Sequence, residues 1–240
     1  MCQSSKTSVV AWLVAVVIAM IMLSTGKKTA RWNAFFILTF ITIQLLEFFV
    51  WWFRESDGLT KSANEAMKAG CGNDKNKPSG DFFVRLIFIA LWIQPLVQTF
   101  MASRYGNPKY KQQLMIITMA YFVMLIWAIT KALDKNATFT AQPSTCEKDS
   151  SGHLVWWRSN DKGFIGPNAA AFLYLFGLFF GLFFMQPKLF GIILIVVGGL
   201  SATYASKHYK NGEASSMWCL LAILYAIVAL MMAKSRKLRE

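Results

Sequence analysis

The apolar residues of this chain are gathered into seven long blocks, which are separated by shorter polar segments. A bilayer core of ~30 Å is crossed by about 20 apolar residues in a helix, with a range of ~17–25. The blocks fall within this range and cover residues 8–24, 34–53, 82–102, 113–130, 169–185, 189–205 and 216–233. The pattern predicts an all-α, polytopic membrane protein with seven transmembrane helices, forming a single domain over residues 1–240.

The fifth and sixth blocks are separated only by Gln186, Pro187 and Lys188. Proline cannot continue a helix interior, so we expect a tight hairpin at this point. The alternative is one long kinked helix, which would run for more than about 35 residues and would be too long for a single span.

Charge is distributed unevenly between the two sides of the predicted bundle. The segments after the first, third, fifth and seventh blocks carry eleven basic residues and one acidic residue, Glu240. The segments on the other side carry thirteen basic and ten acidic residues. The positive-inside rule therefore predicts a cytoplasmic C-terminus and an N-terminus outside. The net charge of +13 is explained by this topology and by attraction to anionic lipids, and it predicts no nucleic-acid partner.

The composition agrees with a membrane protein. Hydrophobic residues make up 55% of the chain and charged residues 15%, whereas soluble domains contain about 25% charged residues. The 20 Phe and 9 Trp also exclude a disordered chain. We expect the first block to be retained rather than cleaved as a signal peptide. Three basic residues, Lys27, Lys28 and Arg31, follow the block, whereas only Lys6 precedes it.

Two of the predicted outside loops are long, residues 54–81 and 131–168. The first contains a capping-box pattern that favours a short surface helix over 62–69. In the second, residues 138–140 and 154–157 allow two interpretations. They form a small β-hairpin, or Trp156 and Trp157 lie at the membrane interface as an aromatic belt. We favour the belt.

One cysteine lies in each long outside loop, Cys71 in the first and Cys146 in the second. An oxidising compartment favours a disulfide between them, and two free thiols or pairing with another chain are the alternatives. Asn136 begins a glycosylation sequon close to the membrane, and its use stays open.

One acidic residue, Glu47, lies deep within a predicted span. A charged carboxylate at this depth costs roughly 2.5–3.5 kcal/mol on insertion scales, so we expect a neutral Glu47 that faces the bundle interior. Gln44 and Trp51 share its helical face because they are spaced i−3 and i+4 from it. Gln94 and Gln98 in the next span are i, i+4 neighbours, whereas Arg85 lies on the opposite side of that helix and is expected to extend to the surface.

These five polar residues, Gln44, Glu47, Trp51, Gln94 and Gln98, define a candidate intramembrane site. One interpretation is an outward-facing polar pocket for a small solute or a proton. The other is a structural role, in which a neutral Glu47 is hydrogen-bonded to Gln and holds two helices together. The pattern predicts no catalytic residue, no cofactor and no metal, since His153 and His208 both lie in outside segments.

Two stretches carry a resemblance. The first is the run from Gln44 to Trp51, and the second runs from Gly212 to Cys219. Together they resemble an uncharacterised family of multi-pass membrane proteins of large DNA viruses and protists, with Leu-Glu-x-x-x-Trp and Gly-Glu-Trp-x-Ser-x-Trp-Cys motifs. This chain departs at Ala214, where the family pattern has Trp. The resemblance brings no activity, but it draws attention to the motif at the entry of the last span: Glu213, Ser216, Trp218 and Cys219.

The sequence therefore favours a non-enzymatic transporter or receptor-like protein with a polar pocket around Glu47. The alternative is a structural or partner-binding membrane protein, such as one of a viral envelope. Several blocks are short, which suits a thin, endoplasmic-reticulum-like bilayer. We therefore expect an endomembrane or a viral membrane rather than the plasma membrane.

Overall fold

The computed structural model describes residues 5–54, 78–134, 139–143, 154–158, 167–208 and 213–234. Each of the seven apolar blocks forms a helix, so the predicted helical fold is confirmed. The helices are α1 (Ser5–Ser24), α2 (Lys28–Arg54), α4 (Pro78–Tyr105), α5 (Lys111–Leu133), α6 (Pro167–Phe180), α7 (Lys188–His208) and α8 (Glu213–Lys234), with 3-10 turns η2 (Pro108–Tyr110) and η4 (Gly181–Phe184).

Five of the helices are long and apolar enough to cross a membrane: Lys6–Ser24, Lys28–Trp52, Phe82–Tyr105, Pro108–Leu133 and Lys188–Ala205. Two other apolar helical stretches in the described residues are shorter, Ala169–Phe184 and Ile223–Lys234. The structure therefore shows a helical protein with the character of an integral membrane protein.

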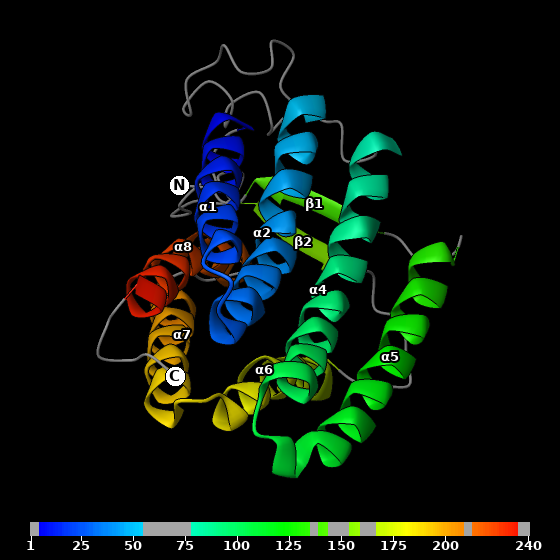
Figure 1. Ribbon diagram of the computed structural model, residues 1–240. Helices are drawn as coiled ribbons and strands as arrows, with labels where there is room; N and C mark the ends of the chain where they lie inside the picture. Colours follow the sequence, from blue (N-terminus) through cyan, green and yellow to red (C-terminus); the bar gives the residue numbers. More distant parts are fainter. Residues whose placement is uncertain are drawn as a thin grey trace.

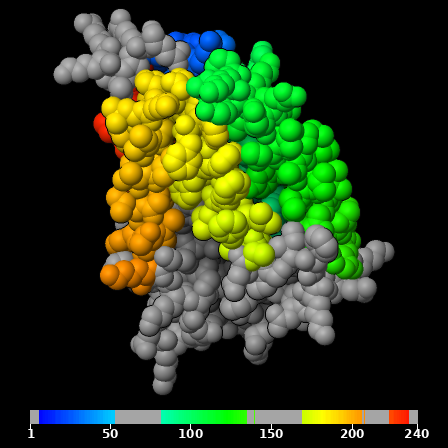
Figure 2. All heavy atoms as spheres, turned by 90° about the horizontal axis from the view of Figure 1, so that it is seen from below, coloured from blue at the N-terminus to red at the C-terminus, as the bar shows by residue number. Residues whose placement is uncertain are grey.

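Helices α1, α2, α4 and α5 follow one another side by side, and each packs on the next (Figure 1). Helix α8 contacts both α1 and α2, and α7 packs on α8. Helix α6 packs on α4 and lies between α5 and α7 when the molecule is viewed from below (Figure 2). Helices α2 and α4 thus form the centre of the bundle.

The turns between helices are gathered at two ends of the bundle. We call the lower end in Figure 1 the basic end, because it carries exposed Lys28, Arg31, Arg104, Lys109 and Lys188. The described part of the chain places no Asp or Glu there. The turn from α1 to α2 depends on Gly26, whose φ of 72° lies in the left-handed region that favours glycine. We call the opposite end the hairpin end.

The predicted break between the fifth and sixth blocks is confirmed. Helical structure ends at Phe184, and α7 begins at Lys188 after Pro187. Two glycines of α7 lie against the preceding segment. A Cβ at Gly191 would lie 2.0 Å from the Leu182 carbonyl oxygen, and one at Gly198 would lie 2.6 Å from the Phe179 ring. Because the later glycine meets the earlier residue, the two segments run antiparallel.

A second pair of glycines brings α6 against α4 and α5. A Cβ at Gly177 would lie 2.5 Å from both Pro95 Cβ and the Tyr121 ring, and one at Gly181 would lie 3.2 Å from Ala102 Cβ. Small residues at i, i+4 allow this close approach of helix backbones, which is a common way for membrane helices to associate.

The segment between α5 and α6 contains a β-hairpin. The interpretation that we favour from the sequence, an aromatic belt without paired strands, is therefore wrong, and the alternative of a hairpin is confirmed. Strand β1 (Phe139–Pro143) pairs antiparallel with β2 (Leu154–Arg158), with Phe139 opposite Arg158. Strand β1 packs on α4, and β2 packs on α8. Pairing satisfies backbone groups that isolated strands would leave open, which a belt of side chains alone does not do.

Several sequence predictions fall on residues outside the described ranges. These are the surface helix over 62–69, the disulfide between Cys71 and Cys146, and the sequon at Asn136. They stay predictions.

Candidate functional site

Helix α2 places Gln44, Glu47 and Trp51 on one face, and all three side chains are 0% exposed. This burial agrees with the inward orientation expected from their spacing. The same face carries Asn33 and Phe36 nearer the basic end, and both contact Tyr225 of α8. The face is therefore an internal one along the whole length of α2.

Gln94 and Gln98 of α4 are also fully buried, and their amides join three helices. The Trp32 indole N–H donates to Gln98 Oε1 at 2.9 Å, which links α2 to α4. Gln94 Nε2 donates to the Phe40 carbonyl oxygen at 3.4 Å, and the Tyr174 hydroxyl of α6 donates to Gln94 Oε1. We call the contact surface between α2 and α4 the α2–α4 interface. Its polar part is formed by Trp32, the Phe40 carbonyl group, Gln94 and Gln98.

The five candidate residues form two groups rather than one pocket. Contacts between Trp32 and Gln98, between Phe40 and Gln94, and between Phe49 and Phe83 show that α2 and α4 run antiparallel. Glu47 lies seven residues beyond Phe40, which is about 10 Å along the helix axis. Gln94 and Gln98 thus lie in the middle and basic half of the bundle, and Glu47 with its neighbours lies toward the hairpin end.

The second sequence motif is carried by the first turns of α8. Glu213 is the first residue of that helix, and Ser216, Trp218 and Cys219 follow within two turns. Their side chains lie outside the described part of the structure. Helix α8 runs antiparallel to α2, because Tyr225 contacts Asn33 and Ala233 contacts Lys27.

This register brings the two motifs to the same end of the bundle. Counted from the contact between Asn33 and Tyr225, Glu47 lies about 21 Å along α2 and Glu213 about 18 Å along α8, both toward the hairpin end. The β-hairpin lies behind this half of α2 in Figure 1 and packs on α4 and α8. The hairpin and the first turns of α8 are therefore the neighbours of this end of the bundle.

Arg85, which was expected to extend to the surface, lies half-buried at the hairpin end and bonds to protein groups there. Its guanidinium donates to the carbonyl oxygens of Ala132 and Asp134, the latter at 2.9 Å, and so caps the C-terminal end of α5. It also lies 4.9 Å from the centre of the buried Phe139 ring in β1. The physical reason is local: carbonyl groups at a helix C-terminus and an aromatic face both attract a cation.

Other polar side chains also bond across the bundle. The Tyr121 hydroxyl of α5 donates to the Leu173 carbonyl oxygen at 2.7 Å, and the Tyr225 hydroxyl donates to Asn33 Oδ1 at 2.7 Å. The Lys27 ammonium donates to the Ala233 carbonyl oxygen at the end of α8. Each of these bonds joins residues that are more than 50 positions apart in the sequence.

A cavity lies among five helices at a position that the sequence reasoning did not single out. Its volume is ≈ 30 Å³. Its described lining comes from α1, α2, α6, η4, α7 and α8: Ala15, Phe36, Ile37, Phe40, Ile41, Leu178, Phe179, Leu182, Gly198, Ser201 and Tyr225. None of the five candidate residues belongs to this lining. No sequence signal marks it, because its residues are of the types that fill every span.

Among the described residues, no group of three or more His, Cys, Asp and Glu side chains lies close enough to hold a metal ion. Comparisons of the chain with protein-family models, with curated proteins and with solved structures gave no match. The resemblance to the family of viruses and protists therefore stays a prediction from the two motifs.

Proposed function

We propose that this chain is a non-enzymatic membrane protein with seven spanning helices, whose N-terminus lies outside and whose C-terminus is cytoplasmic. The two shorter helices support seven spans by length. Residues 167–184, which form α6 and η4, and the 22 residues of α8 would extend about 27 and 33 Å if fully helical, so either reaches across a thin bilayer. The exposed cations and the lack of described acids at the basic end support the orientation.

An epitope tag at each terminus tests the orientation. After selective permeabilisation of the plasma membrane, a C-terminal tag is expected to bind antibody, whereas an N-terminal tag binds only after the internal membranes are permeabilised as well. Labelling of the N-terminal tag and not of the C-terminal tag in the first condition would reverse the orientation and would remove the basis for a bridge between Cys71 and Cys146. Mass spectrometry of unreduced peptides measures that bridge directly.

For the polar residues, the geometry supports the structural alternative best: the protein is a structural or partner-binding membrane protein in which Glu47 holds helices together. The observation that carries this proposal is the complete burial of Glu47 together with Gln44, Gln94, Gln98 and Trp51. The cavity found among the described residues is lined by none of them. A packed carboxyl group in hydrocarbon contributes to helix association when it is neutral and bonded.

Two substitutions at position 47 test this role. Glu47→Gln keeps the shape and hydrogen-bonding capacity of the neutral acid, so the folded fraction and the melting temperature in detergent are expected to stay near those of the wild type. If Glu47 holds helices together, Glu47→Leu takes a polar group away from the buried groups around it and is expected to cost about 1–3 kcal/mol. Equal stability of the two variants would contradict a role in holding the helices.

The second candidate function is a transporter or receptor-like protein that uses Glu47 for a proton or a small solute. It is favoured by the depth of the acid, because ionisable groups inside a membrane commonly mark a transport or relay site. Proteoliposomes with an internal pH dye separate the two candidates. Proton movement that is present in the wild type and lost in Glu47→Gln would establish transport and replace the structural proposal.

The bilayer that contains the protein is proposed to be an endomembrane or a viral membrane. Support comes from the short apolar stretches, since thinner membranes accommodate them at lower cost. Fractionation of tagged protein against markers of the endoplasmic reticulum and the plasma membrane tests this placement. The viral alternative is tested by whether the protein is present in purified virions.

A further inference from the structure

The cavity among α1, α2, α6, α7 and α8 is lined almost entirely by apolar groups. Only two of its described lining residues, Ser201 and Tyr225, carry polar side-chain atoms. The Ser201 hydroxyl donates to the Gly198 carbonyl oxygen within α7 at 2.8 Å, and the Tyr225 hydroxyl donates to Asn33 at 2.7 Å. Since both hydroxyl groups are engaged by the protein, the lining favours a hydrocarbon group over a polar solute.

The cavity lies near the middle of the predicted bilayer. From the basic end, Phe36 and Ile41 lie about 12 and 20 Å along α2, and Gly198 and Ser201 lie about 15 and 20 Å along α7. The midplane of a ~30 Å hydrocarbon core is about 15 Å from either boundary. At this depth the surrounding solvent consists of lipid acyl chains, in particular their terminal methyl parts.

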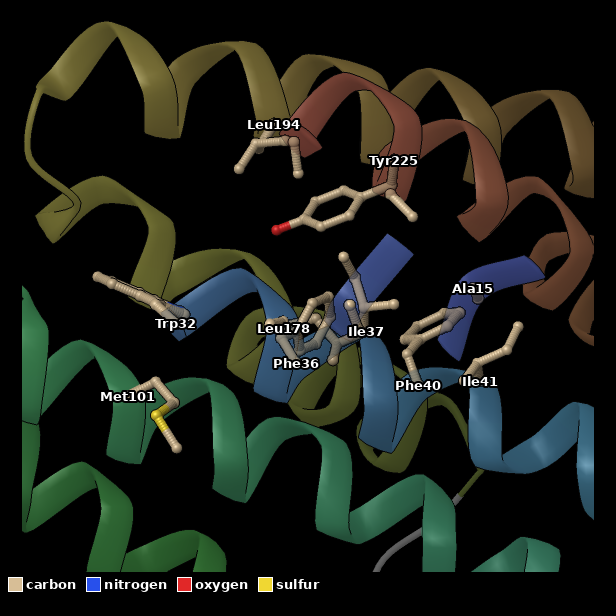
Figure 3. Close-up of a cluster of buried hydrophobic side chains, with 14 of the residues drawn as sticks. Ala15, Trp32, Phe36, Ile37, Phe40, Ile41, Met101, Leu178, Leu194 and Tyr225 are labelled. Carbon is tan, nitrogen blue, oxygen red and sulfur yellow. The ribbon is translucent and has the colours of Figure 1, made fainter. Parts of the chain in front are cut away.

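The helix packing explains why this space is not filled by protein. Gly177 draws α6 toward Pro95 of α4 and Tyr121 of α5, whereas Gly191 draws α7 onto η4, and α7 then packs on α8. Beyond their hairpin, α6 and α7 meet through the Phe179 ring, which lies against Gly198, and the cavity lies beside this contact. In the close-up of the neighbouring core, the Tyr225 ring lies between α7 and α2, with Phe36 and Leu178 below it (Figure 3).

We propose that this cavity binds the end of an acyl chain of a membrane phospholipid. An unfilled cavity has no atoms to provide dispersion contacts to its lining, and a chain end supplies them without desolvating any polar group. The neighbouring α7 residues Val196 and Leu200 are 51% and 66% exposed, so α7 borders the lipid from which such a chain is drawn. The inference is independent of the role of Glu47.

Photolabelling of the full chain in phospholipid nanodiscs tests the proposal. The probe is a phosphatidylcholine with a diazirine near the terminal methyl of one acyl chain, and mass spectrometry maps the labelled residues. Labelling at Phe36, Ile37, Gly198 or Ser201 is expected to exceed that at the exposed α5 residues Ile116 and Val123. Uniform labelling of cavity and α5 surface in the wild type would overturn the proposal, and this comparison needs no variant.

A matched pair of variants on α7 sharpens the test. Ser201 and Thr203 both bond to a carbonyl oxygen of their own helix, but Ser201 lines the cavity and Thr203 is exposed. Ser201→Leu is expected to lower cavity labelling on α2 by about fivefold or more, because the added side chain occupies the space, and Thr203→Leu leaves it unchanged. An equal effect of the two variants would contradict the proposal.

Two further experiments test the cavity with a second filling variant and distinguish a phospholipid from a free fatty acid. Ala15→Leu fills the cavity from α1, with Ala120→Leu on the exposed face of α5 as its control, in case Ser201→Leu does not fold. A free fatty acid with the same diazirine is added to separate nanodiscs. Enrichment of the fatty acid without enrichment of the phospholipid would reject a phospholipid as the occupant.

Discussion

Two faces of the same helix, α2, differ in how they hold their neighbours. Toward α4, Trp32 and the Phe40 backbone take part in hydrogen bonds with Gln98 and Gln94. Toward α7 and α8, Phe36, Ile37 and Ile41 line an apolar cavity. On the first face, two side-chain hydrogen bonds join α2 directly to α4. On the second face, the Tyr225–Asn33 hydrogen bond lies beside lining groups that make mainly dispersion contacts, with space left over. Polar bonding along α2 is therefore richer on the side of α4.

Lipid changes the value of each kind of contact. Apolar side chains gain little by leaving hydrocarbon for a protein interior, so packing quality and polar bonds decide which helices associate. Bonds between membrane helices average about 0.6 kcal/mol and reach about 1.7 kcal/mol in double-mutant cycles. The α2–α4 interface is accordingly expected to be more sensitive to substitution than the cavity region.

The largest expected effect is at Gly177, where α6 meets α4 and α5. Gly177→Leu introduces atoms where a Cβ alone would lie 2.5 Å from Pro95 and Tyr121, and the expected cost is about 3 kcal/mol. Gly199→Leu is the control, since a Cβ there meets nothing within 4 Å. Thermal unfolding in detergent measures both. If the two variants lose stability equally, the proposed difference between the two regions is wrong.

A smaller effect is expected from the bond between Trp32 and Gln98. Trp32→Phe removes the donor to a fully buried Gln98 and is expected to cost about 1–2 kcal/mol. Adding Gln98→Leu removes the acceptor as well, so the double variant is expected to be more stable than the sum of the single losses predicts. A double-mutant cycle in detergent measures this coupling, and additive losses would show that the bond does not contribute.

The smallest effect is expected on the cavity side. Tyr225→Phe removes one hydrogen bond to Asn33 and keeps the ring against Phe36, so we expect a cost near the average of about 0.6 kcal/mol. The measurement is again the melting temperature in detergent. A loss larger than that of Trp32→Phe would place the critical polar contact beside the cavity and would reverse the comparison.

Several features followed from the sequence because their causes are local. Pro187 lies in a three-residue polar break and disfavours a continuous helix, so two helices were predicted there and are present, whereas Pro95 is accommodated inside α4. The spacing of Gln44, Glu47 and Trp51 puts them on one face, and the cost of exposing Gln or Glu to lipid turns that face inward. All three are buried.

The bonding partners of these residues required the tertiary structure. The periodicity of α4 shows that Gln94 and Arg85 point to opposite sides, but Gln94 bonds to Tyr174 of α6, and Arg85 caps α5. Both partners lie far away in the sequence. The β-hairpin likewise depends on pairing between Phe139–Pro143 and Leu154–Arg158. The sequence did not decide between the hairpin and an aromatic belt, because both interpretations use the same residues, Trp156 and Trp157.

The sequence by itself determined the membrane character, the positions of seven helices, the end of the bundle that carries the basic residues and the inward face of α2. The tertiary structure decided which helices pair, which polar groups bond and where the cavity lies. The physical reason is that lipid-facing and protein-facing sides of a membrane helix are both apolar, so hydrophobicity marks a span without marking its neighbour. Neighbours are chosen by glycine contacts and by single hydrogen bonds, which exist only once the helices are packed.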